Sequence, residues 1–294
     1  MPRTRLSTAF DPLVRLLVLA ILLASVLPVE GPARVVAQGV ADAAIFVLFF
    51  LNGMRLPTAE VVRGFRNARF LVPLIGWCFG VMALAGLGLS WAAAAFLPAT
   101  VALGFVFIGV LPSTVQSATA YASLAGGNVA ASVVAAATLN VLGVLVSAPL
   151  LALLGGGVAI DLDASGLQRI ALVLLLPFTL GQVLRAPLGR VVAERRALVT
   201  WVDRMAIAIS VYVAFSGAVE QGLWTLLGPG SWAGLLLLVG VFLALGFAGS
   251  WLAGGWLGLG RADRISFLFA GAQKSIALGA PLASVLFAPA TAGL

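Results

Sequence analysis

Long apolar stretches of about twenty residues, separated by short segments of Gly, Pro and charged residues, restrict this chain to few folds. A run of roughly 20 apolar residues is long enough for a helix to cross a bilayer. Such windows predict nine membrane spans, at residues 13–29, 38–56, 69–89, 97–123, 128–154, 168–188, 200–220, 231–257 and 265–289. Only 9% of the residues are charged, against about 25% in soluble proteins. The sequence therefore predicts an all-α polytopic membrane protein whose first partner is the lipid bilayer.

The arginines predict the orientation of these spans. The loops after spans two, six and eight contain most of them: Arg55, Arg63, Arg66, Arg69, Arg185, Arg190, Arg195, Arg196, Arg261 and Arg264. The alternate loops contain only Arg34 and Arg169. Because cytoplasmic loops are enriched in arginine, we expect a cytoplasmic N-terminus in the cell (inner) membrane. The net charge of +7 is explained by this asymmetry, so we expect no nucleic-acid partner.

A sequence pattern, F-x-F-x-G-x-x-x-S, occurs from Phe105 to Ser113 and again from Phe267 to Ser275, 162 residues apart. The same offset maps spans one to three approximately onto spans six to eight. Five spans separate the copies, so the copies cross the membrane in opposite directions, as in an inverted repeat. We expect two five-helix repeats, residues 1–154 and 155–294, with a tenth span missing after Leu294. Chance matches of common residues are the alternative.

The first span follows a basic segment and could also be a signal peptide. The repeat favours its retention, because the first five-helix unit needs it.

Spans four and nine combine helix breakers with polar side chains at mid-membrane depth. Pro112 lacks a backbone N–H and frees carbonyl groups, and we expect Gly271 and Gly279 to break span nine. The polar residues of these segments are Ser113, Thr114, Gln116, Ser117, Gln273, Lys274 and Ser275. Two broken helices in equivalent halves predict a transporter's midplane binding site. The alternative is two kinked helices that pack through small residues.

Lys274 is the only lysine of the chain. It lies about nine residues into an apolar segment, or roughly 14 Å deep at 1.5 Å per residue. An ionisable group at that depth costs at least ~2.5–3.5 kcal/mol, so Lys274 requires a partner or a function. The alternatives are that it snorkels to the interface or neutralises a buried acid.

Span five adds three polar residues. Asn128 follows two glycines and is most simply a helix cap. Ser132, about one turn further on, either faces the site or packs between helices. Asn140 is deep and needs a hydrogen-bond partner, as a contact between helices or as part of the site.

The chain contains no histidine and one cysteine, Cys78. No intramolecular disulfide can form, and neither a histidine-based enzyme nor a Cys/His metal site is expected. We therefore predict that the protein is not an enzyme, and sodium is the only cofactor that we consider.

Several of these segments resemble the bile acid:sodium symporter family, and most closely its divergent bile acid symporter-like branch. They are Leu111-Pro112-Ser113-Thr114-Val115, Leu124-Ala125-Gly126-Gly127-Asn128-Val129-Ala130, Pro177-Phe178-Thr179-Leu180-Gly181-Gln182, Gln273-Lys274-Ser275 and Leu278-Gly279-Ala280-Pro281-Leu282. The resemblance implies two inverted five-helix repeats, with spans four and nine broken where they cross. It also implies a panel of spans one, two, six and seven beside a core of spans three to five and eight to nine. Members that transport couple the inward movement of an organic anion to sodium.

The carry-over of the family's sodium ligands is incomplete. A Glu-x-Gly-x-Gln-Asn stretch of the family corresponds to Phe269, Gly271, Gln273 and Lys274, so an acidic ligand is lost and a cation is gained. The remaining candidate sodium ligands are Gln116, Ser117, Ser132 and Gln273.

We hypothesise that Lys274 replaces one sodium ion by donating to oxygens of Gln116 and Ser117 and to carbonyls freed around Pro112. Transport would then be sodium-independent, or driven by one remaining sodium, or by proton loss from the lysine. The leading function is alternating-access secondary transport of a small organic anion. The alternatives are a non-transporting membrane regulator with the same fold and, more remotely, a membrane enzyme.

Overall fold

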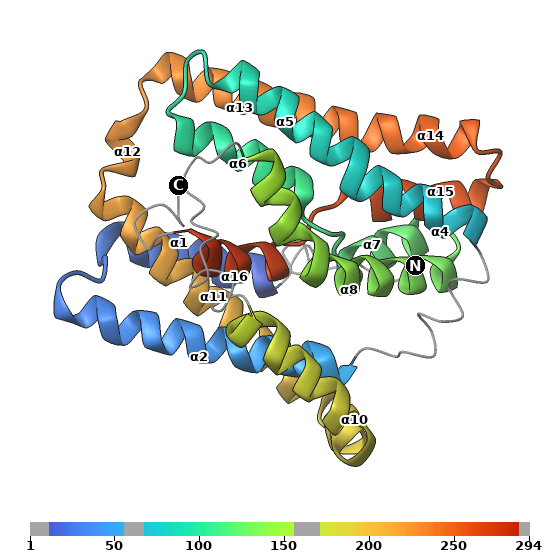
Figure 1. Cartoon of the computed structure of the whole chain (residues 1–294), viewed down its shortest axis with the longest axis horizontal. Helices are drawn as coiled ribbons and strands as arrows, with labels where there is room; N and C mark the ends of the chain where they lie inside the picture. Colours follow the sequence, from blue (N-terminus) through green and yellow to red (C-terminus); the bar gives the residue numbers. More distant parts are fainter. Residues whose placement is uncertain (1–11, 56–67, 156–170, 288–294) are drawn as a thin grey trace, which may run out of the picture. The chain divides into compact units, whose positions relative to one another are not determined.

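The computed structural model describes residues 12–55, 68–155 and 171–287, and every regular element in these ranges is helical (Figure 1). Seven helical stretches are long and apolar enough to cross a membrane, and Pro12–Val26 and Ala99–Val110 are shorter apolar helices. The expected loop residues Arg63, Arg66 and Arg169 lie outside the described residues. The chain is thus a polytopic helical membrane protein, as its apolar stretches predict.

The described helices form two compact units. The first unit contains α1 (Pro12–Val26), α2 (Pro32–Arg55), the π-helix η4 (Ala171–Leu175), α10 (Leu176–Glu194) and α11 (Arg196–Glu220). The second contains α4 (Ala68–Ile75), the π-helix η3 (Gly76–Val81), α5 (Met82–Ala93), α6 (Ala99–Val110), α7 (Val115–Leu124), α8 (Val129–Leu154), α13 (Pro229–Ala244), the π-helix η5 (Leu245–Gly249), α14 (Ser250–Trp256) and α15 (Arg261–Ala272). The short α12 (Leu223–Leu226) and α16 (Ile276–Leu286) contribute residues to both units.

In the first unit, α2 packs against α10 and α11, and α1 packs against α11. Two glycines allow α2 and α10 to touch. A Cβ on Gly53 would lie 2.2 Å from the carbonyl oxygen of Phe178, and one on Gly181 would lie 2.1 Å from that of Phe50. Small residues permit such close approach where no hydrophobic effect drives helices together in lipid. The Gln182 amide also donates to the carbonyl of Gly53.

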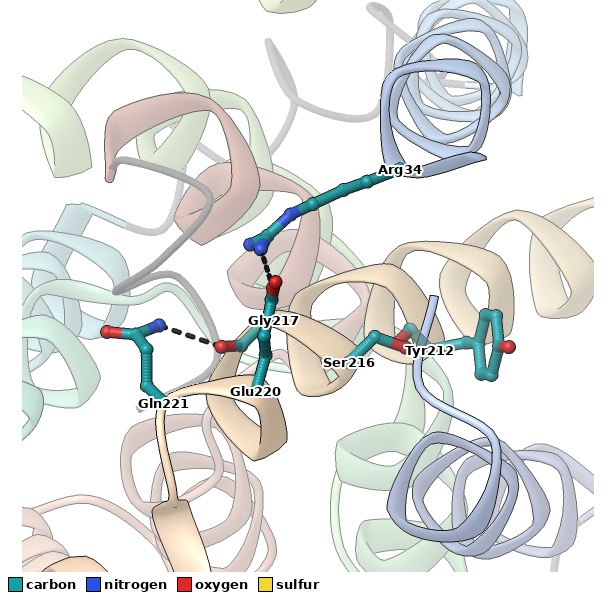
Figure 2. Close-up of polar contacts among 6 residues, drawn as sticks. All are labelled: Arg34, Tyr212, Ser216, Gly217, Glu220 and Gln221. Atoms are coloured by element: carbon teal, nitrogen blue, oxygen red, sulfur yellow. Dashed lines mark hydrogen bonds and ion pairs between the residues drawn. The ribbon is translucent and has the colours of Figure 1, made fainter. Parts of the chain in front are cut away.

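Two ion pairs join α2 to α11, one near each end of the pair. Arg34, near the start of α2, reaches Glu220 at the end of α11 (Figure 2). Arg55, the last residue of α2, pairs with Asp203 near the start of α11. Asp203 is only 8% exposed, so this ion pair joins the two helices from a buried position.

The second unit has a packed aromatic and aliphatic centre. Phe70, Leu71, Leu74 and Phe267 are buried in one cluster, and the rings of Phe70 and Phe267 meet edge to face at 6.0 Å. Phe267 is the first residue of the second copy of the repeated sequence pattern. This position of the pattern therefore serves packing rather than binding.

The glycine of the first pattern copy also has a packing role. A Cβ on Gly109 of α6 would lie 2.8 Å from the carbonyl oxygen of Met82, and one on Gly86 of α5 would lie 2.3 Å from that of Phe105. The backbones of α5 and α6 therefore touch, which only small residues allow.

Two pairs of short helices are separated by extended segments. We call Leu111–Thr114, between α6 and α7, the first break, and Gln273–Ser275, between α15 and α16, the second break. Leu111 has φ −70° and ψ 146°, and Gln273 has φ −79° and ψ 143°. Both values are extended backbone, so each helix stops and restarts in the polar segment that its sequence suggested.

Candidate site at the two helix breaks

The first break leaves a row of backbone carbonyls without helical donors, and each carbonyl from Gly109 to Ser113 receives another donor. Lys274 Nζ donates to Gly109 O at 2.9 Å and to Leu111 O at 2.8 Å. Ser147 Oγ donates to Val110 O at 2.8 Å, and Ser275 N donates to Pro112 O at 2.8 Å. Asn140 Nδ2 donates to Ser113 O at 2.7 Å. Buried carbonyls without a donor are costly in lipid. The carbonyls of the break are therefore satisfied by groups distant in sequence.

Lys274 is the centre of this arrangement. Its ammonium also donates to Cys78 O at 3.2 Å and approaches Cys78 Sγ at 3.7 Å. An ammonium has three N–H donors, so the three carbonyls of Cys78, Gly109 and Leu111 match its capacity. Two of these oxygens belong to the C-terminal end of α6, where the helix dipole favours a cation.

This geometry decides between the alternatives for Lys274. In the described part of the chain, Lys274 pairs with no carboxylate, and its ammonium is held by three backbone oxygens instead of reaching solvent. The expected donation to carbonyls around Pro112 is observed. The expected contact with Ser117 is not, because Ser117 Oγ donates to Gln273 Oε1 at 2.6 Å. The side chain of Gln116 lies outside what the structure describes.

Cys78 contributes through its backbone, from within the π-helix η3. A π-helical turn shifts the hydrogen bonds from i→i−4 to i→i−5, and such turns often occur at functional sites. Here the shift is seen at Met82, whose N–H donates to Trp77 O. Sequence reasoning missed this ligand because any residue carries a carbonyl.

The two breaks also bond to each other directly. Thr114 Oγ1 donates to Lys274 O at 3.0 Å, and Ser117 and Gln273 form the side-chain bond described above. Together with the bond from Ser275 N to Pro112 O, these contacts make the breaks one connected site in the second unit.

Gly271 and Gly279 do not form the second break, contrary to expectation. Gly271 lies inside α15 and Gly279 inside α16. A Cβ on Gly271 would lie 2.8 Å from Ser250 Oγ, and one on Gly279 would lie 2.6 Å from Leu111 Cδ1. These glycines are contact positions for neighbouring side chains.

Helix α8 supports the first break along one face. Asn140 bonds to Ser113 O and Ser147 to Val110 O, while a Cβ on Gly143 would lie 2.5 Å from Pro112 Cγ. These residues recur at intervals of three to four, which places them on one helix face. The sequence signal for Ser147, which was not among the predicted site residues, is its position seven residues after Asn140.

Asn128 caps α8, as predicted, by accepting a hydrogen bond from Ala131 N at 3.1 Å. Its amide donates to Asp263 Oδ1 at 2.8 Å, its N–H donates to Ala262 O at 3.0 Å, and its carbonyl accepts from Ser266 Oγ at 2.8 Å. Asn128 thus joins the α7–α8 turn to the start of α15, a contact role that is separate from the breaks.

The second break differs from the first in one respect. The carbonyls of Ala270, Gly271, Ala272 and Gln273 accept no hydrogen bond from the described residues. The hydroxyls of Ser113 and Ser132 are buried and likewise have no partner within the described ranges. The C-terminal end of α15 therefore offers oxygens without the ammonium that the end of α6 receives.

An all-helical chain with several membrane spans, and with two broken helices bonded at their breaks, has the features of a secondary transporter. The family comparison agrees with this class. A model of the SBF-like CPA transporter family matches residues 11–294. The chain belongs to that family.

Of three similar proteins, two have names that refer to transport. The chain is 38% identical over 280 residues to the Pseudomonas aeruginosa protein PA2026, covering 94% of this chain and 84% of the relative. It is 32% identical to the Escherichia coli protein named "Putative symporter YfeH", covering 99% of this chain and 87% of the relative. It is 24% identical to sodium/bile acid cotransporter 7 of Danio rerio, covering 83% of this chain and 73% of the relative.

Proposed function

We propose that this membrane protein is a secondary active transporter of a small organic anion, working by alternating access around the two helix breaks. The observation that carries the proposal is the ammonium of Lys274, bound by carbonyls of Cys78, Gly109 and Leu111. The family and the names of two relatives, a symporter and a sodium/bile acid cotransporter, support transport.

The proposal includes nine spans in an inverted repeat, five in residues 1–154 and four in residues 155–294. An offset of 162 residues carries the bounds of α6 onto those of α15, and those of α7 nearly onto those of α16. The contact of α1 with α11 corresponds under this offset to that of α10 with α2. Both observations support the repeat. The gathering of α1, α2, α10 and α11 in one unit supports a panel that is separate from a core. We place the N-terminus in the cytoplasm and the protein in the inner membrane.

In this mechanism, Lys274 is a tethered cation that replaces one coupling ion. Carbonyl oxygens at a half-helix C-terminus are suitable ligands for a cation in membrane transporters. A covalently attached ammonium occupies such a cation-binding site at any sodium concentration. The loss of an acidic ligand at Phe269 fits the same exchange, because one fewer mobile cation needs one fewer negative charge.

A second possible cation-binding site lies at the C-terminal end of α15. The unbonded carbonyls of Ala270 to Gln273 are hard oxygen ligands of the kind that sodium prefers, and they lie at the negative end of a half-helix. Of the expected sodium ligands, Ser132 has a free hydroxyl, whereas Ser117 and Gln273 bond to each other. We therefore favour coupling to one remaining sodium among the three modes considered.

The anion would bind at the start of α7. The Thr114 side chain bonds to Lys274 O and does not cap α7, so the first N–H groups of that helix keep their capacity to donate. Uncapped helix starts bind carboxylates and phosphates. Ser113 and Ser275 flank the two half-helix starts and complete the proposed polar set.

Proteoliposome flux tests the proposal. An anion selected by thermal-shift screening should accumulate in vesicles with wild-type protein, and Lys274→Met should abolish uptake or change its dependence on sodium. Arg261→Gln, at an exposed helix start, serves as the control with an unaltered site. Unchanged uptake by Lys274→Met at every sodium concentration and pH would refute the role of Lys274. Absence of flux for every anion tested would favour a non-transporting regulator.

A further inference from the structure

A group of exposed arginines lies at the turn between α10 and α11, outside the site described above. We call Arg190, Arg195 and Arg196 the basic turn. All three side chains are exposed. None of them forms an ion pair or a side-chain hydrogen bond with another described residue.

Three other described arginines have clear partners. Arg34 and Arg55 form ion pairs with Glu220 and Asp203. Arg264 lies 3.9 Å from the centre of the Trp251 ring and donates to Trp251 O at 2.7 Å. Three free guanidinium groups within seven residues are therefore a local feature of the basic turn.

The surroundings of the basic turn match a membrane interface. Trp201 is half exposed, and the guanidinium of Arg204 lies over its ring, 5.8 Å from the ring centre. Trp201 lies five positions after Arg196, about 8 Å along a helix. Tryptophan prefers the headgroup level of a bilayer. The exposed apolar side chains of Leu188, Val191 and Leu198 continue the surface towards the hydrocarbon.

We propose that the basic turn binds the phosphate group of an anionic phospholipid. Guanidinium groups bind phosphate oxygens through paired N–H donors, and clusters of arginine beside membrane helices attract anionic lipids. Arg195 makes no side-chain cap at the start of α11, so backbone N–H groups add to the positive charge there. The exposed apolar residues hold the acyl chains beside α10 and α11.

Arginines at a helix turn also orient a span during insertion, and that role alone would need no bound lipid. Lipid retention by the purified full chain distinguishes lipid binding from a role in span orientation alone. Native mass spectrometry in detergent with phosphatidylglycerol or phosphatidylcholine should show preferential retention of phosphatidylglycerol. Arg195→Gln with Arg196→Gln should weaken that retention about 25-fold, since each arginine contributes about fivefold.

The matched control is Arg69→Gln with Arg261→Gln, which removes two exposed arginines from helix starts in the other unit. It should change retention less than twofold. Arg195→Lys with Arg196→Lys should give an intermediate loss, because charge is kept and the paired donors are not. Size-exclusion profiles check that each variant is folded.

The proposal is overturned if both double variants lose lipid equally, or if phosphatidylcholine is retained as well as phosphatidylglycerol. It is also overturned if inorganic phosphate at matched concentration displaces the lipid completely, since the site would then recognise a free anion.

Discussion

Lys274 Nζ lies 2.8 Å from the carbonyl oxygen of Leu111, so a side chain from one broken helix caps the C-terminal end of the other. The ammonium supplies the positive charge that a helix C-terminus attracts. It also replaces the helical donors that the carbonyls of Gly109 and Leu111 lose where α6 ends. Charge and backbone repair are therefore combined in one residue, and its removal should affect both.

Lys274→Ala should leave the carbonyl of Gly109 without a donor and that of Leu111 with only the weak contact from the Cys78 thiol at 3.7 Å. Each orphaned buried acceptor costs about 1–3 kcal/mol, so we expect a clear loss of thermal stability in detergent. If these carbonyls form a cation-binding site, sodium should stabilise Lys274→Ala more than it stabilises the wild type. Potassium and choline at equal ionic strength are the controls, and equal recovery with choline would argue against a cation-binding site.

Ser147→Ala should destabilise the protein more than Ser210→Ala. Both hydroxyls are buried and donate at 2.8 Å to a carbonyl. Ser147 satisfies Val110 O at the break, whereas Ser210 shares Ala206 O of its own helix. Only the first change leaves an acceptor unbonded, so we expect an extra loss of about 1–2 kcal/mol. Chemical unfolding in mixed micelles measures the difference, and equal losses would contradict the account of the break.

The Ser117–Gln273 bond should couple the two breaks energetically. In a double-mutant cycle with Ser117→Ala and Gln273→Ala, we expect a coupling of about 0.5–3 kcal/mol, because the residues are in direct contact. The same cycle with Ser117→Ala and Thr200→Ala is the control, since the Thr200 hydroxyl donates within its own helix. Additive effects in the first cycle would mean that this bond does not hold the breaks together.

Gly53→Ala should be far more harmful than Gly39→Ala on the same helix. A Cβ on Gly53 would lie 2.2 Å from a backbone oxygen of α10, while one on Gly39 would meet nothing within 4 Å. A backbone atom cannot move aside as a side-chain end can, so α2 and α10 would separate at a cost of about 1–3 kcal/mol or more. Thermal melting of the two variants makes the comparison, and similar melting temperatures would show that the close contact is dispensable.

Much of the site was predictable where a residue type carries the signal. Pro112 stands among polar residues, and Gln273, Lys274 and Ser275 are polar within an apolar stretch, so the polar segments predicted both breaks. Proline alone was not sufficient, because Pro73, Pro149, Pro187 and Pro281 lie inside helices. Gly271 and Gly279 were harder to interpret. A glycine can end a helix or permit a close contact, and only the positions of Ser250 and Leu111 beside them decide for contact.

The sequence by itself determined a helical membrane protein with polar breaks in two segments, because the lengths of apolar runs and the polar residues that interrupt them are local properties. The tertiary structure decided what Lys274 binds. Its acceptors are backbone carbonyls of Cys78, Gly109 and Leu111, which lie more than 160 positions away and have no side-chain identity to recognise. Every residue has a carbonyl oxygen, and only folding selects which oxygens lose their helical donors and meet in one place.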